Sequence, residues 1–190
     1  MVSDDVVAAF AAASRTNSCT VHGPVAVTDA PRLLAQIVRD DLGDGPIAIA
    51  DRDPALRDLA LVDALRGIER DLCRPTDPEW DAKLRRASIG ITGAHLGVAE
   101  QGVFALACSA DTPRATSLLP PTHVCIVFTD TLLATFAEAI EHVATTLAPL
   151  PSALTWVGGP SRTGDLEMVQ TLGVHGPKRV EVVLVDDAGL

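Results

Sequence analysis

The chain has no tyrosine and few other aromatic residues, with two Trp and four Phe among its 190 residues. Aromatic rings supply the stacking surfaces on which many nucleic-acid-binding proteins hold bases. The formal net charge of −10, from 25 acidic and 15 basic residues, repels phosphate backbones and anionic membrane surfaces. The composition therefore argues against nucleic acid and against a membrane surface as partners.

Long hydrophobic runs and paired cysteines are also missing. No run approaches the roughly eighteen apolar residues of a membrane-spanning helix, and the opening MVSDDVV lacks the basic flank of a signal peptide. The four cysteines stand far apart with no CxxC pair, which argues against a structural zinc site or an iron–sulfur cluster held by this chain alone. We expect a cytoplasmic protein with reduced thiols.

Short apolar runs alternate with segments of helical periodicity along the chain. The sequence predicts strands at 47–50, 88–92, 103–107, 123–128, 153–157 and 180–185, and helices at 6–13, 29–42, 53–65, 77–86 and 130–147. Such alternation is typical of α/β proteins with a parallel sheet. We expect an open, mostly parallel sheet flanked by helices, in a single domain over residues 1–190. Residues 1–75 are either part of that domain or an appended lobe.

A glycine-rich segment at residues 158–167, GGPSRTGDLE, follows the strand expected at 153–157. A short helix is expected after it, so backbone N–H groups and the helix dipole would favour a small anion there. Gly159, Ser161, Arg162 and Thr163 are candidate ligand-binding residues, and Asp165 is a candidate catalytic residue. The alternative is structural, because Ser161 or Thr163 can simply cap the helix.

Three further residues carry functional groups at turns or strand ends. His175 lies between Gly173 and Gly176, where an imidazole can act as a base, an acid or a ligand. Glu100 precedes a glycine between two strands and is a candidate base or nucleophile. His123 begins a strand and is a candidate ligand-binding residue. Each also has a structural interpretation, as a turn, a surface charge or a hydrogen-bonded core residue. A metal site built from these residues and Asp165 is weakly supported, because their spacing is wide.

Five motifs occur in an order that resembles the LUD domain of the lactate-utilization protein C type. The motifs are Gly90-Ile91-Thr92, Ala99-Glu100-Gln101-Gly102, Arg114 before Ser117-Leu118-Leu119-Pro120 and His123, residues 159–167, and Gly173-Val174-His175-Gly176-Pro177. The match is good over residues 87–190 and loose before them. It departs from the family at Gln101, where the family usually has Thr, and at Gly164, where Ala is common.

The resemblance implies a NagB/RpiA/CoA-transferase-like fold and a role in oxidising L-lactate to pyruvate beside iron–sulfur partner proteins. It also makes Arg114 a candidate ligand-binding residue, because a cation there suits a carboxylate. The ligand would be a small carboxylate or a nucleotide, and no cofactor is identified. Two other hypotheses stay open: a stand-alone transferase or ligase that uses Glu100, and a non-catalytic binding module.

The strand directions constrain whether the two glycine-rich loops can form one site. The loop at 158 follows a strand, whereas the turn at 173–178 precedes one. We expect them to share a pocket only if the last strand runs antiparallel to its neighbours, or if the short helix folds the turn back over the loop.

Overall fold

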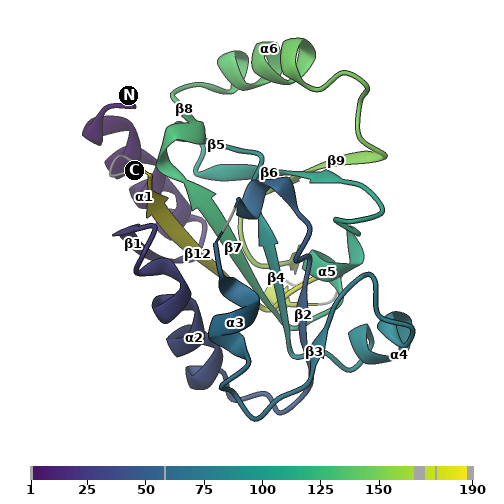
Figure 1. Ribbon diagram of the computed structural model, residues 1–190. Coiled ribbons are helices and arrows are strands. Elements are labelled where there is room, and N and C mark those ends of the chain that lie inside the picture. Colours follow the sequence, from purple (N-terminus) through teal and green to yellow (C-terminus); the bar gives the residue numbers. More distant parts are fainter. Residues whose placement is uncertain (1, 58, 165–169, 174, 188–190) are drawn as a thin grey trace.

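The computed structural model describes residues 2–57, 59–164, 170–173 and 175–187. Its centre is a six-stranded sheet in which every neighbouring pair of strands is parallel (Figure 1). In spatial order the strands are β1 (Thr20–Ala26), β12 (Arg179–Asp186), β7 (Thr122–Phe128), β4 (Ile89–Gly93), β2 (Ile47–Ile49) and β3 (Leu72–Cys73). The predicted parallel α/β architecture is confirmed. Three of these strands come from the first 75 residues and pair in the same sheet as the others.

Both faces of the sheet are covered, which explains why its strands are apolar without interruption. Along β7, Val124, Ile126 and Phe128 pack with helices α2 (Ala30–Asp40) and α3 (Leu61–Leu65). The alternate residues Cys125 and Val127 pack on the opposite face. The expected cover on both faces of the last strand is confirmed, because residues 182–185 of β12 are fully buried.

A smaller, four-stranded sheet covers that opposite face together with helix α1 (Asp4–Thr16). Its strands, in spatial order, are β8 (Leu132–Leu133), β5 (Leu96–Val98), β6 (Val103–Cys108) and β9 (Ala153–Val157). The pairs β5–β6 and β6–β9 are antiparallel. Helix α6 (Phe136–Thr146) packs on the outer face of this second sheet, as Figure 1 shows.

Short elements complete the chain. They are the 3-10 turns η1 (Pro54–Leu56) and η2 (Thr129–Thr131), the helices α4 (Trp80–Leu84) and α5 (Ala115–Leu118), and the antiparallel pair β10 (Arg162–Gly164) and β11 (Gln170–Leu172). Helix α5 lies against β4, where a Cβ on Gly90 would come within 1.8 Å of the Thr116 carbonyl oxygen. Only glycine allows that approach. Across the described residues, no helix has the length and hydropathy to cross a membrane.

Two predicted helices are wrong in part. Residues 130–147 were expected to form one helix, but Leu132 and Leu133 form β8 and pair with β5, so α6 begins only at Phe136. Residues 53–65 were also expected to be one helix. They form η1 and α3 instead, separated by a segment in which Arg57 has a φ of 50°.

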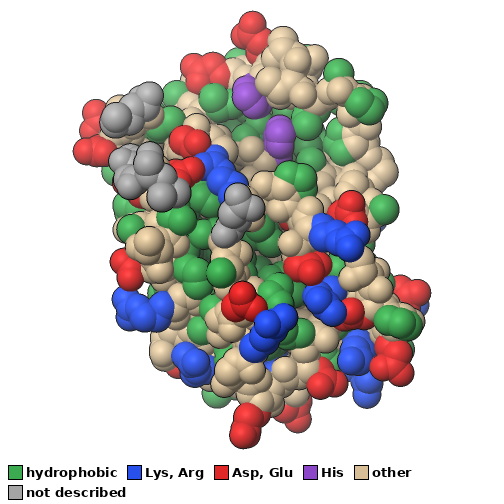
Figure 2. Space-filling model, viewed as in Figure 1, with side chains coloured by type: hydrophobic (Ala, Val, Ile, Leu, Met, Phe, Trp, Pro, Cys, Tyr) green, Lys and Arg blue, Asp and Glu red, His purple; other side chains and the backbone are tan. Residues whose placement is uncertain are grey.

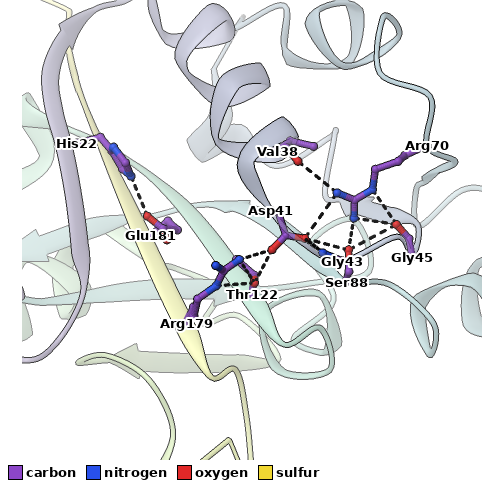
Figure 3. Close-up of polar contacts among 10 residues, drawn as sticks. All are labelled: His22, Val38, Asp41, Gly43, Gly45, Arg70, Ser88, Thr122, Arg179 and Glu181. Atoms are coloured by element: carbon purple, nitrogen blue, oxygen red, sulfur yellow. Dashed lines mark hydrogen bonds and ion pairs between the residues drawn. The ribbon is translucent and has the colours of Figure 1, made fainter.

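A buried ionic network joins the amino ends of β4, β7 and β12 (Figure 3). At its centre is Asp41, whose side chain is 5% exposed and forms ion pairs with Arg70 and Arg179. The Asp41 carboxylate also accepts hydrogen bonds from Ser88 Oγ at 3.3 Å and Thr122 Oγ1 at 3.1 Å. Two guanidinium groups therefore compensate one desolvated carboxylate, and removal of Asp41 would leave the guanidinium group of Arg70, whose side chain is 10% exposed, without its carboxylate partner.

Candidate functional site

The two glycine-rich segments meet at a pocket of about 190 Å³ at the amino ends of β7 and β12. Gly159 and Ser161 contribute from the loop after β9, and His175 and Gly176 from the turn before β12. His123, near the start of β7, also lines the pocket. The structure thus brings together four of the residues that the sequence singled out as site candidates: His123, Gly159, Ser161 and His175.

The loops meet by a route that the strand-direction argument did not include. Strand β12 runs parallel to both of its neighbours, so the first of the two conditions stated for a shared pocket, an antiparallel last strand, is not met. Strand β9 belongs to the second sheet, and its carboxyl end arrives where β7 and β12 begin. Backbone hydrogen bonds hold the loops together: Ser161 N–H donates to the Pro177 carbonyl, and Gly173 N–H donates to the Ser161 carbonyl, each at 2.9 Å.

Gly159 is required by the path of this loop. Its φ of 135° lies in a region that L side chains rarely adopt, and a Cβ there would be 2.3 Å from the Asn17 carbonyl oxygen. Arg162 lies on the same side, where its guanidinium donates to the Asn17 carbonyl and to Ser18 Oγ. Arg162 therefore attaches the loop to the end of α1 and is not among the residues that line the pocket.

His123 is the buried polar group of the pocket. Its side chain is 1% exposed, and its Nε2 is 2.9 Å from Thr92 Oγ1. Within the described part of the chain, its Nδ1 has no hydrogen-bond partner. Burial lowers the pKa of His123 to about 4, so the imidazole is neutral at neutral pH. A buried nitrogen without a partner is unfavourable.

The rest of the pocket offers hydrogen-bond donors and no negative charge. Ser161 Oγ accepts a 3.4 Å hydrogen bond from the His175 backbone N–H, which leaves the hydroxyl proton of Ser161 to donate elsewhere. The His175 side chain is exposed at the rim. None of the described lining residues is acidic, although the whole chain carries a net charge of −10. The lining therefore suits a neutral or anionic ligand.

Other predicted site residues lie elsewhere. The Glu100 carboxylate accepts a 3.3 Å hydrogen bond from Phe136 N–H at the start of α6. The helix dipole stabilises a negative charge at this position. Residue 163 is in β10, antiparallel to residue 171. Asp165 lies outside the described residues. The short helix expected after the loop is not formed at 162–164 or 170–172, which are strands.

Arg114 lines a second, much smaller cavity of about 10 Å³, which Thr92 also lines. Asp53 also lines that cavity, and Ser117 borders both this cavity and the pocket. Asp53 accepts hydrogen bonds from the backbone N–H groups of Ala55 and Gly93, and burial raises its pKa. A space of this size holds about one water molecule.

Sequence reasoning did not name Thr155, Trp156 and Asp53 as site residues, and it named Thr92 and Ser117 only as members of the motifs that carry the resemblance. Thr155 and Trp156 appeared only as members of a buried strand. Strand β9 pairs only with β6, at the edge of the second sheet, and its other edge borders the pocket. Asp53 did carry a local signal, because an Asp that follows a strand and precedes a proline often caps the next turn.

Comparisons with known proteins identify relatives of the chain. The family model of the LUD domain matches residues 12–185. The chain is 30% identical to "Lactate utilization protein C" of Bacillus subtilis over 188 residues, which cover 90% of this chain and 76% of that protein. It is 39% identical to the protein of the same name from Deinococcus radiodurans over 116 residues, 60% of this chain and 54% of that protein.

A solved structure agrees with the fold. A "duf162 family protein" from Deinococcus radiodurans superposes with a TM-score of 0.68 at 26% identity, covering 95% of this chain and 96% of that one. The chain spans about half the length of several curated relatives named lactate utilization protein C, for example 50% of the one from Bacillus licheniformis.

The buried histidine makes stability depend on pH. Because the folded pKa of His123 is about 4 and an unfolded histidine titrates near 6.5, the unfolded state gains a proton first as the pH falls. From this residue we expect the free energy of unfolding to fall by on the order of 2 kcal/mol between pH 7 and pH 5.

Urea denaturation of the wild type and of His123→Gln at both pH values measures this contribution by difference, because the other titrating groups are common to both proteins. The wild type should lose more stability than the variant. An equal loss in both proteins would show that His123 does not titrate in this way.

Proposed function

This chain belongs to the LUD domain family, and we propose that it is a subunit of an L-lactate oxidation system that binds a small carboxylate in the His123 pocket. The observation that carries the proposal is the unpartnered Nδ1 of His123 at a pocket without acidic lining. The names of the relatives from Bacillus subtilis and Deinococcus radiodurans point to lactate utilization. L-Lactate and pyruvate are the small carboxylates that fit this context.

The pocket has room for a three-carbon acid. Its volume of 190 Å³ is many times that of the neighbouring 10 Å³ cavity, which holds about one water molecule, and L-lactate has six non-hydrogen atoms. Among the ligand classes expected from the sequence, we favour the small carboxylate, because the names of the relatives point to lactate utilization.

The chemistry of recognition follows from the hydrogen bonds already present. If Thr92 donates its hydroxyl proton to His123 Nε2, the single proton of the neutral ring is on Nδ1, which can then donate to a ligand oxygen. The Ser161 hydroxyl and the His175 side chain supply further donors from the two loops. Donors fixed by packing and by the loop–loop hydrogen bonds lose little conformational entropy when the ligand binds.

We assign electron transfer to iron–sulfur partner proteins and not to this chain. All four cysteines are buried and free, and burial raises the pKa of Cys19 and Cys73 to about 11. Cluster ligation requires thiolates, which these surroundings disfavour. The proposed role of this subunit is to hold the carboxylate, and the redox step is carried out by the partners.

Calorimetric titration with L-lactate and pyruvate tests the pocket directly. We expect Ser161→Ala and His175→Ala each to raise the Kd by about tenfold, since a hydrogen bond to a charged group contributes about 1.5 kcal/mol or more. Arg162→Ala is the matched control from the same loop, because its side chain is directed at α1, and it should change the Kd less than about threefold. A larger increase in the Kd for Arg162→Ala than for Ser161→Ala would show that the ligand binds outside this pocket.

The role in the pathway is tested by growth. A host that lacks the gene should fail to grow on L-lactate as sole carbon source, and the wild-type gene should restore growth. We expect the His123→Gln variant to restore it poorly while it accumulates to wild-type levels, and the wild-type protein to co-purify with iron–sulfur proteins. Normal growth of the deletion strain on L-lactate would refute the pathway assignment and would leave the binding measurements valid.

A further inference from the structure

The opposite, carboxyl edge of the six-stranded sheet contains a topological switch point. After β2 the chain goes to β3 on one side, whereas after the adjacent β4 it goes to β7 on the other side. In open parallel sheets, ligands bind in the crevice outside the carboxyl ends of two such strands. The His123 pocket lies at the amino edge, so the crevice between β2 and β4 is a separate place and its use does not depend on the function proposed above.

A pocket of about 200 Å³ occupies this crevice. Pro54, Ala55 and Arg57 line it from the segment after β2, and Ala94 and His95 line it from the end of β4. On this face of the molecule, Figure 2 shows histidine side chains beside a hollow with a hydrophobic floor. Most of the wall is apolar, with one guanidinium and one imidazole as its principal polar groups.

Arg57 contributes a planar guanidinium group whose positive charge is already balanced by carboxylates. Its guanidinium carbon lies 3.8 Å from the centroid of the buried Phe128 ring, so one face of the group is covered and the other can stack on a second planar group. Its N–H groups form ion pairs with Asp130 and Asp187. Because two carboxylates already balance the one positive charge, this pocket does not favour an anion.

His95 supplies a directional contact. Within the described chain, its buried Nε2 has no hydrogen-bond partner. Burial and the neighbouring His142 lower its pKa, so the ring is neutral at neutral pH and Nε2 offers either one proton or one lone pair. The unused nitrogen is therefore suited to a heteroatom of an uncharged ligand.

Beyond the Arg57–Asp130 ion pair lies a second hollow of about 290 Å³ with an acidic lining that includes Asp4, Asp130 and Asp187. Carboxylates at this place repel phosphate groups and accept hydrogen bonds from hydroxyl groups, as in the ribose contacts of dinucleotide-binding sheets. A sugar attached to a base in the first pocket would reach toward these carboxylates.

We propose that the crevice between β2 and β4 binds an uncharged nucleoside, with the base stacked on Arg57 and hydrogen-bonded to His95 Nε2, and the sugar hydroxyls on Asp130. Arg guanidinium planes are established stacking partners of bases in other proteins. The His123 pocket binds its carboxylate independently of this site.

Calorimetric titration of the full chain with adenosine tests the proposal, with ATP as the charged probe. We expect adenosine to bind at least about tenfold more tightly than ATP, because the acidic hollow repels phosphates. His95→Phe keeps an aromatic ring without nitrogen, and Arg57→Lys keeps the charge without the planar group. Each should weaken adenosine binding about tenfold or more.

His142→Ala is the control, because His142 contacts the His95 ring without lining the pocket, and it should change the affinity less than about threefold. The titration with L-lactate should be the same in all three variants and in the wild type. Absence of adenosine binding at millimolar concentration, tighter binding of ATP than of adenosine, or full affinity in both His95→Phe and Arg57→Lys would each overturn the proposal.

Discussion

Asp41 and its two arginine partners fix the amino ends of the central strands, and the position of the His123 pocket follows from that constraint. Asp41 ends the region of α2, Ser88 precedes β4, Thr122 begins β7 and Arg179 begins β12. His123 is the residue next to Thr122, and the turn at 175–178 leads directly into Arg179. Because a buried ionic network tolerates little displacement of its members, both walls of the pocket are held in register by the same carboxylate.

The parallel sheet was predictable because its strands are buried on both faces, and continuous apolar runs such as residues 180–185 indicate this directly. The break at Leu132 and Leu133 was not apparent, because their spacing to Phe136 also fits one face of a helix. Their strand conformation depends on pairing with β5, a three-residue strand from a distant part of the chain. A local signal did exist: Thr135 and Glu138 form a capping box, which marks a helix start at Phe136.

The candidate site was predictable in its residue types and not in its geometry. Glycine positions beside Ser161 and His175 indicated exposed loops with polar groups, and both loops do line one pocket. Strand β9 belongs to a second sheet and so brings its loop to the amino end of β12. This placement depends on long-range strand pairing that no local pattern encodes. The pairing of β5 with β8 places Glu100 at the start of α6, although its motif alone was also compatible with a catalytic carboxylate.

The measurement that tests the central claim most directly is ¹⁵N NMR of the histidine side chains in uniformly labelled protein, with the His123 signals identified by their loss in His123→Gln. If the pocket at the amino ends of β7 and β12 holds a carboxylate through His123, saturating L-lactate will shift the Nδ1 resonance of His123 and leave that of His95 in place. Unchanged His123 resonances at saturating L-lactate would contradict the account.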